Sequence, residues 1–192
     1  MKKEHFKKMV DSKVDEFWFK RIVEDKSSKS SLAMMSVSQL QIGMCHPVWK
    51  TVRNSPNDVE KAAIKARILT GTYTLQANRS KFKQYIVDPT CPLCGKGIEN
   101  RKHFILLCPV TETARTKVKQ KIIDRMNSST VTHLDVQNDD ILLQIIVDCS
   151  ALIVGPQYSG LRHEVETLSG ELIYYVHDLY AHARMNFILF YS

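Results

Sequence analysis

With 192 residues, 44% of them hydrophobic, the chain can bury the core of one domain, alone or with a small appendage. Its net charge of +7 originates in the middle, where Glu60 to Arg125 carries fourteen Lys and Arg against five Asp and Glu, while residues 1–59 carry +4 and residues 126–192 carry −6. No secretory signal is visible, and the longest apolar run, Ile141 to Val154, is shorter than the roughly 20 residues that a bilayer span needs. We therefore expect an intracellular protein that does not enter membranes, with nucleus and cytoplasm equally open.

The N-terminal stretch His5 to Asp25 has the pattern of an amphipathic helix. Its apolar residues recur at helical spacing with lysines between them: Phe6, Val10, Val14 and Phe17. The run Lys26 to Ser31 then predicts a linker or a helix boundary. Pro47 interrupts the following segment, residues 32–55, for which we expect irregular structure with Trp49 as its core anchor.

Two further helices are predicted on either side of a cysteine-rich motif. The first opens at the capping signal Asn54-Ser55-Pro56-Asn57 and ends near Gly71. One face of it carries Val59, Ala63, Ala66 and Leu69, and the residues expected to point away are Lys61, Lys65 and Arg67. The second helix, Thr111 to Met126, is basic. Val118 and Ile122 share one side of it, and around the rest lie Arg115, Lys117, Lys119, Lys121 and Arg125.

The C-terminal third is expected to be helical as well. Asp139-Asp140 would cap the segment Ile141 to Val154, which is apolar nearly all round, so a buried helix is predicted and a buried strand is the alternative. A long amphipathic helix follows on the spacing of Leu161, Val165, Leu168, Leu172, Tyr175 and Leu179.

Four residues inside an eighteen-residue stretch match a metal site. Cys91-Pro-Leu-Cys94 is followed by Gly95, which permits the positive φ that turns the backbone away from a metal. The second half runs from His103 to Cys108-Pro109. On an ideal helix these two ligands would lie about 140° apart, so the chain must unwind near Cys108, as the following proline favours.

Cys91, Cys94, His103 and Cys108 are therefore predicted to hold one structural Zn²⁺ with all four coordination positions filled. The alternative is a set of unrelated thiols beside a surface histidine. Cys45 and Cys149 are interpreted as structural residues. The sequence thus predicts a mainly α fold, a small helical domain with an inserted zinc knuckle. Its regions are an N-terminal amphipathic helix and linker (1–31), a helical and zinc-knuckle region (32–127) and a C-terminal helical region (128–192).

Three segments carry a family resemblance: Lys65 to Arg79, Asp88-Pro-Thr-Cys91-Pro-Leu-Cys94-Gly, and Glu99 to Pro109. Together they resemble the zinc-binding segment that follows the polymerase in reverse transcriptases of animal non-LTR retrotransposons. The match covers about residues 58–110, and Trp49 and Asp148-Cys149-Ser150 also look similar. The resemblance implies a nucleic-acid-binding tail that helps to hold template RNA or target DNA during target-primed reverse transcription.

The sequence departs from such enzymes in its catalytic motifs. A polymerase needs paired carboxylates on a hydrophobic hairpin to hold two magnesium ions, whereas Asp139-Asp140 follow Asn138 in a polar loop. Pro109-Val-Thr-Glu lacks the Pro-Asp and spaced carboxylates that the restriction-like nucleases of some elements place there. We therefore expect no enzymatic activity from the chain, which looks like a C-terminal piece of an element or a host gene derived from one.

The leading functional hypothesis is a binding module whose cationic face contacts the phosphates of RNA or DNA. The predicted contacts are Lys61, Lys65, Arg67, Arg79, Lys81, Lys83, Arg101 and Lys102. The interleaved aromatics are expected to serve the core rather than to stack on bases: Tyr73, Phe82 and Tyr85. The alternative is a protein-interaction domain that uses the C-terminal helix and acidic tail, for example with the polymerase portion of the same element.

Overall fold

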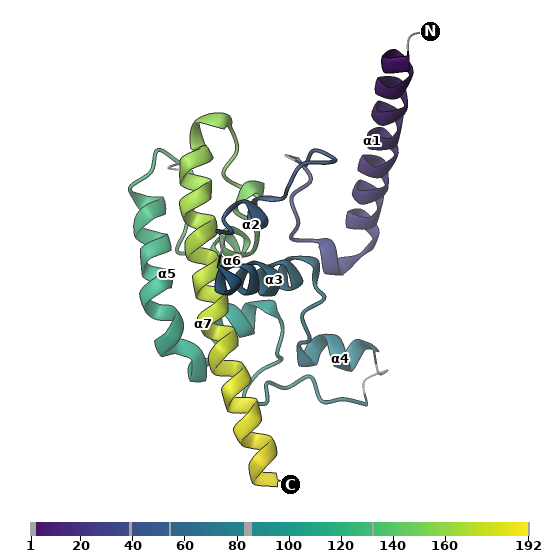
Figure 1. The fold of residues 1–192 in the computed structure, drawn as a ribbon. Helices are drawn as coiled ribbons and strands as arrows, with labels where there is room; N and C mark the ends of the chain where they lie inside the picture. The colour runs from purple at the N-terminus through teal and green to yellow at the C-terminus, as the bar shows by residue number, and fades with distance from the viewer. Residues whose placement is uncertain (1–2, 39, 54, 83–85, 132, 192) are drawn as a thin grey trace.

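The computed structural model describes residues 3–38, 40–53, 55–82, 86–131 and 133–191, and this part of the chain is mainly helical (Figure 1). The longer helices are α1 (Lys3–Ser28), α3 (Pro56–Thr70), α5 (Glu112–Asn127), α6 (Asp139–Asp148) and α7 (Ser159–Tyr191). The shorter elements are η1 (Ser30–Leu32), α2 (Pro47–Lys50), α4 (Gln76–Phe82), η2 (His103–Leu107), η3 (Pro109–Thr111), η4 (Cys149–Ala151) and η5 (Pro156–Tyr158). The described residues form no strand, only an isolated antiparallel bridge between Thr90 and Ile98. The predicted mainly helical class is confirmed.

Helix α7 is the element against which the others pack. In Figure 1 it runs along the body, with α5 beside it and α3 crossing it. One hydrophobic core joins α7 to α3, α5 and α6, and its fully buried members include Ile68, Ile122, Ile145, Ile146, Val165, Leu172, Ile173 and Val176. Removing this apolar surface from water is the main force that holds the fold together.

Helix α6 is buried on nearly all sides, so the helix prediction is confirmed over the strand alternative. Its N-cap is Asn138, whose side-chain oxygen accepts hydrogen bonds from the backbone N–H groups of Asp140 (2.8 Å) and Ile141 (3.3 Å). The prediction that Asp139-Asp140 form the cap is therefore wrong. These acids occupy the first turn, where their charge suits the positive end of the helix dipole.

The described helices include none that has, by itself, the length and apolar composition of a membrane span. Residues 139–151 and 156–183 meet those criteria only as a pair, across a bend of 113°.

Helix α3 ends as predicted at Gly71, whose φ of +69° is a conformation that side-chain-bearing residues rarely adopt. Its apolar face is rotated from the predicted one. Val59 is 48% exposed, whereas Lys65 is 1% exposed and its Nζ lies 2.6 Å from Oε1 of Glu166 on α7. Asn54 of the predicted capping signal lies outside the described residues.

The segment before α3 is largely irregular, as expected, apart from η1 and the four-residue α2. The expected core anchor Trp49 is 41% exposed, and Val48 is the buried residue at 3%. Pro47 opens α2, and Nδ1 of His46 accepts a hydrogen bond from the N–H of Val48 (3.2 Å). The short capped helix therefore directs Val48 into the core, which corrects the assignment of Trp49.

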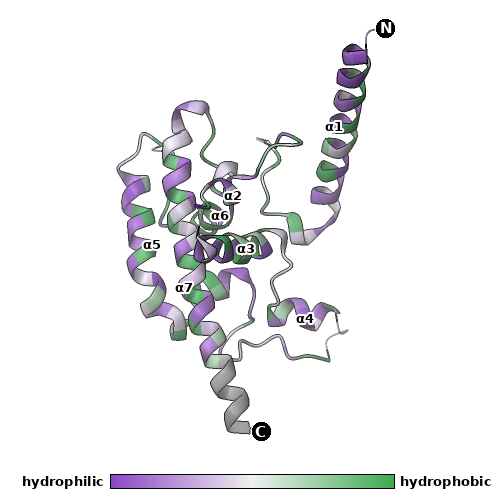
Figure 2. Cartoon of the chain, in the orientation of Figure 1, coloured by the Kyte–Doolittle hydropathy of each residue, from purple (hydrophilic) through white to green (hydrophobic). Residues whose placement is uncertain are grey.

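Helix α1 confirms the predicted N-terminal helix, yet none of its residues is buried. In Figure 1 it extends away from the body, which it meets near its C-terminal end, beside η1. Its predicted apolar stripe stays exposed, with Phe6 at 51%, Val10 at 40%, Val14 at 46% and Phe17 at 62%. Figure 2 shows hydrophobic and hydrophilic residues side by side along this isolated helix.

Candidate metal centre

The first two candidate ligands lie in a tight hairpin. The backbone N–H of Gly95 donates to the carbonyl of Cys91 (2.9 Å), and the N–H of Cys91 donates to the carbonyl of Gly97 (2.7 Å). Gly95 adopts a φ of +64°, as the sequence predicted for the residue after the second cysteine. The hairpin thereby brings the sulfurs of Cys91 and Cys94 to the same side of the backbone.

A wide helical turn joins the other two candidate ligands. His103–Leu107 forms one π-helical turn, in which the N–H of Cys108 donates to the carbonyl of His103 five residues earlier (2.8 Å). More residues fit into such a turn than into an α-helical one, so the spacing of five no longer separates the ligands by about 140°. Cys108 itself leaves the helical region at ψ 119°. The break expected at Cys108 is confirmed, and the π turn is a feature that the sequence did not reveal.

The four ligand atoms converge on one point. The sulfurs of Cys91, Cys94 and Cys108 and an imidazole nitrogen of His103 all lie within 4.8 Å of one another. The Cys91 and Cys108 sulfurs are 4.0 Å apart, and Sγ of Cys94 is 3.3 Å from Nε2 of His103. A tetrahedron with Zn–S near 2.3 Å and Zn–N near 2.1 Å requires sulfurs about 3.8 Å apart and sulfur to nitrogen about 3.6 Å. The cluster therefore has the dimensions of a metal site, and Nε2 is the His103 atom that faces it.

The surrounding protein shifts the pKa values of the candidate ligands in different directions. Burial raises the pKa of Cys91 to about 12, against the effect of hydrogen bonds from the backbone of Cys94 and Leu93. Burial alone would also raise the pKa of Cys94. Hydrogen bonds outweigh this effect and lower the pKa, and the largest contribution among them comes from the backbone of Lys96. Burial also lowers the pKa of His103, which favours the neutral imidazole that binds metals. Backbone donors beside two sulfurs and a neutral imidazole suit a metal–thiolate centre.

Asn100 and Gly97 lie close to His103. The N–H of His103 donates to Oδ1 of Asn100 (2.9 Å). A Cβ atom at Gly97 would lie 3.1 Å from Nδ1 of the ring, closer than most side chains tolerate. After His103 the turn enters the core, where Phe104, Ile105 and Leu106 are buried, whereas the following Leu107 is 47% exposed.

Arg115 was expected on the solvent side of its helix, and the structure corrects this. Its side chain is 6% exposed, and Nη1 donates to the carbonyl oxygen of Cys108 and to Oγ1 of Thr111 (3.1 Å). The guanidinium group therefore contacts the backbone of the candidate ligand Cys108. Burial lowers the pKa of Arg115, and the charges of Glu112 and Cys108 act in the opposite direction.

Glu99 connects the hairpin to α4, an element that the sequence did not predict. This residue is fully buried, and its Oε2 accepts a hydrogen bond from the N–H of Gln76 (2.7 Å) while its carbonyl accepts one from Ala77 (3.3 Å). These are the first two residues of α4, so the hairpin supplies the N-terminal cap of this helix.

The exposed side of α4 carries charged and aromatic groups. Lys81 is exposed, and Phe82 is 87% exposed. The expectation that Phe82 serves the core is therefore wrong, whereas it is confirmed for Tyr73, which is 9% exposed. Tyr85 lies outside the described residues.

Four of the predicted phosphate contacts form an ion pair or a hydrogen bond to the backbone inside the protein. Lys65 is buried against Glu166, so its assignment as a contact is wrong. Arg101 donates to the carbonyl of Ser31 (2.6 Å). The other two form ion pairs near the surface: Lys61 with Asp58 (3.7 Å) and Lys102 with Asp140 (2.8 Å).

The remaining predicted contacts are more accessible. Arg67 and Lys81 are exposed, and Arg79 is half-buried, with its Nη1 donating to Oε1 of Gln76 (3.3 Å). Lys83 lies outside the described residues. Two of the described three, Arg79 and Lys81, belong to α4.

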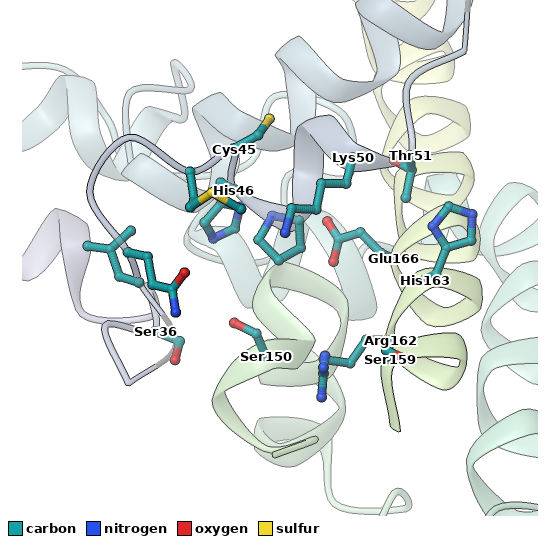
Figure 3. A pocket seen from close by; sticks show the side chains of 14 residues that line it. Ser36, Cys45, His46, Lys50, Thr51, Ser150, Ser159, Arg162, His163 and Glu166 are labelled. Carbon is teal, nitrogen blue, oxygen red and sulfur yellow. The ribbon is translucent and has the colours of Figure 1, made fainter. Parts of the chain in front are cut away.

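A cavity of about 240 Å³ lies elsewhere, between the segment before α3 and the first turns of α7 (Figure 3). Figure 3 shows cationic Lys50 and Arg162 on its wall together with the carboxylate of Glu166. Arg162 is held by the carbonyls of Ile153 (3.0 Å) and Gly155 (2.6 Å). The mixture of both charges indicates no single class of ligand.

Comparisons of the chain with models of protein families, with curated proteins and with solved structures give no match. Functional interpretation therefore depends on the geometry and chemistry of the residues themselves. The cluster of Cys91, Cys94, His103 and Cys108 is the part of the described structure where these are most specific.

Proposed function

We propose that the chain is a nucleic-acid-binding module held together by one structural zinc ion. The observation that carries the proposal is the convergence of three cysteine sulfurs and Nε2 of His103 on one point. Three thiolates and one imidazole suit Zn²⁺, and they would fill its tetrahedron without leaving a position for substrate. The ion would then cross-link the hairpin to the π turn and take no part in chemistry.

The metal centre supports the proposed binding surface through α4. A helix of seven residues is too short to be stable alone, so α4 depends on the cap that Glu99 supplies from the hairpin. It presents Arg79 and Lys81 beside the exposed ring of Phe82. Proteins bind single strands by combining cations that contact phosphates with aromatic faces that stack on bases. The proposed ligand is therefore single-stranded RNA or DNA.

The resemblance of the motif adds a biological setting to this proposal. The module would correspond to the region after the polymerase of a non-LTR retrotransposon reverse transcriptase. It would hold template RNA or target DNA and contribute no polymerase or nuclease step of its own.

A salt titration with fluorescent single-stranded RNA and DNA tests the binding surface. Each phosphate contact contributes about 0.7 to the slope of log affinity against log salt, so Arg79→Ala with Lys81→Ala should lower the slope by about 1.4. Phe82→Ala should weaken binding about 5- to 150-fold and leave the slope unchanged, because stacking carries no charge. The matched control is Lys117→Ala with Lys121→Ala on α5, which lies across α7 from α4 in Figure 1 and should keep the slope.

The metal is tested separately. Protein purified without added metal should contain one zinc ion per chain, and Cys94→Ser should contain much less. Unchanged zinc in that variant would refute the site. If the zinc-loaded wild type binds no oligonucleotide at low salt, the nucleic-acid function fails and the metal assignment stands.

Exposed apolar residues favour a second candidate, a protein-interaction domain. On α7, where the sequence placed this surface, Tyr175 and Leu179 are 46% and 40% exposed, but the rest of the predicted stripe packs largely against the core. Helix α1 exposes more, including Phe17 at 62% and Trp18 at 51%. Binding of the purified polymerase portion of such an element, lost on Phe17→Glu with Trp18→Glu, would support this function.

A further inference from the structure

A metal–thiolate centre of the proposed composition carries a net charge. Zn²⁺ with three thiolates and one neutral imidazole sums to −1, and Cys91 and Cys108 are each only 2% exposed. Charge held in such surroundings is costly unless an opposite charge lies nearby. Backbone donors beside Cys91 and Cys94 offset part of this cost, and a cation in the same buried environment would offset more of it.

Arg115 is a buried cation beside the centre. It is buried, its guanidinium group donates to the carbonyl of Cys108, and its charge interacts with both Cys108 and His103. The basic residues near the hairpin are engaged elsewhere or face water: Arg101 bonds to Ser31, Lys102 pairs with Asp140, and Lys96 is exposed. Arginine stays protonated in proteins, so burial does not remove its charge.

We infer that Arg115 is the counterion of the metal centre and raises its affinity for a divalent ion. The inference rests on the proposed zinc site and adds to it a residue that binds no metal itself. Arg115 acts by position, since its donor group ties the Cys108 ligand to the first turns of α5. Outer groups of this kind typically change metal affinity by about 10- to 100-fold.

The test compares Arg115→Met with Arg115→Lys in the full chain. Zinc affinity is measured by competition with a chromophoric chelator, and the ligand geometry is checked by the absorption spectrum of the Co²⁺-loaded protein. Arg115→Met, similar in length but neutral, should bind zinc about 10- to 100-fold more weakly. Arg115→Lys keeps the charge and should recover most of that loss. Lys117→Met, the same charge change at an exposed position of α5, should bind like the wild type.

A second measurement separates the counterion role from ordinary packing. The carbonyl of Cys108 also accepts hydrogen bonds from the N–H and Oγ1 of Thr111 (both 3.3 Å), so Arg115→Met does not leave it without a donor. Metal removal lets the sulfurs take up protons, which takes away the negative charge near Arg115. Urea unfolding should therefore show Arg115→Met less stable than the wild type with zinc, and equally or more stable with a chelator present.

Three results of these measurements would contradict the counterion role of Arg115, and a fourth would refute the zinc site itself. Equal zinc affinity of Arg115→Met and wild type would overturn the inference, as would the same loss of stability with and without metal. A wild type that binds no zinc would instead refute the proposed centre. Weak binding by Arg115→Lys as well as Arg115→Met would show that shape matters and charge does not, which also contradicts the counterion role.

Discussion

Lys65 and Glu166 place opposite charges inside the core, with side-chain exposures of 1% and 2% and 2.6 Å between Nζ and Oε1. Each charge costs several kcal/mol to remove from water, and their attraction offsets that cost only while both partners are present. The pair joins α3 to α7, the two helices whose apolar faces meet in the core. Its energetic effect therefore depends on whether one partner is removed or both.

Replacing one member should be far more harmful than replacing both. Lys65→Met leaves the carboxylate of Glu166 buried and unpaired and should lower the free energy of unfolding by about 3–5 kcal/mol. Lys65→Met with Glu166→Leu should restore most of this loss. Urea unfolding of the zinc-loaded proteins measures both, and Lys61→Met, a less buried position on α3, should change it by less than about 1 kcal/mol. A double variant as unstable as the single one would contradict this explanation.

Single residues were predictable where spacing along the chain encodes their role. Cys91, Cys94, His103 and Cys108 stand at metal-ligand spacing, and the structure brings them together. We expected Lys65 and Arg115 to be exposed, because charged residues of an amphipathic helix usually lie on its solvent-facing side. Burial of Lys65 depends on its ion pair with Glu166, which lies 101 residues later in the chain. The local sequence pattern around Lys65 cannot predict a partner at that distance.

The longer helices follow from local patterns. Apolar periodicity predicts α1, α5 and α7, and a glycine stop fixes the end of α3. The exception is α4, whose seven residues show no apolar period and whose cap comes from Glu99, 23 residues away. The π turn was equally hidden, because the same residues would suit an α-helix if the metal ligands did not have to converge.

The dependence of α4 on Glu99 is testable. Glu99→Ala leaves the N–H of Gln76 without its side-chain acceptor, which should cost about 1–2 kcal/mol. Hydrogen exchange in α4 should become faster and oligonucleotide binding weaker, while the zinc content stays at one ion per chain. Glu99→Gln keeps an oxygen acceptor and should retain most of the protection. Unchanged exchange in Glu99→Ala would mean that α4 does not need this cap.

For the whole molecule, the core is distinct from the metal hairpin. The fully buried residues of α3, α5, α6 and α7 form one cluster without the four metal ligands. The connections of residues 88–102 to the body include Leu93, which packs against this cluster, the polar contacts of Glu99, Arg101 and Lys102, and the π turn. Many small zinc domains unfold without their metal because they lack a core of this size.

Metal removal should therefore loosen part of the molecule and leave the rest folded. With a strong chelator, far-UV circular dichroism should retain most of its helical signal, while hydrogen exchange becomes fast in residues 88–102 and in α4. The four core helices should keep their protection. Cooperative loss of the entire helical signal on chelation would show instead that the metal is required for the fold as a whole.

Helix α1 has a consequence for how the stability of this protein is measured. It contributes 26 residues of helix and no buried side chain. A helix with few tertiary contacts melts gradually and over a broad range, whereas the packed body unfolds in one narrow step. Thermal melting followed by ellipticity should therefore begin with a steep native baseline before the main transition. A two-state fit that assigns the whole signal to one step would broaden the apparent transition and understate its enthalpy.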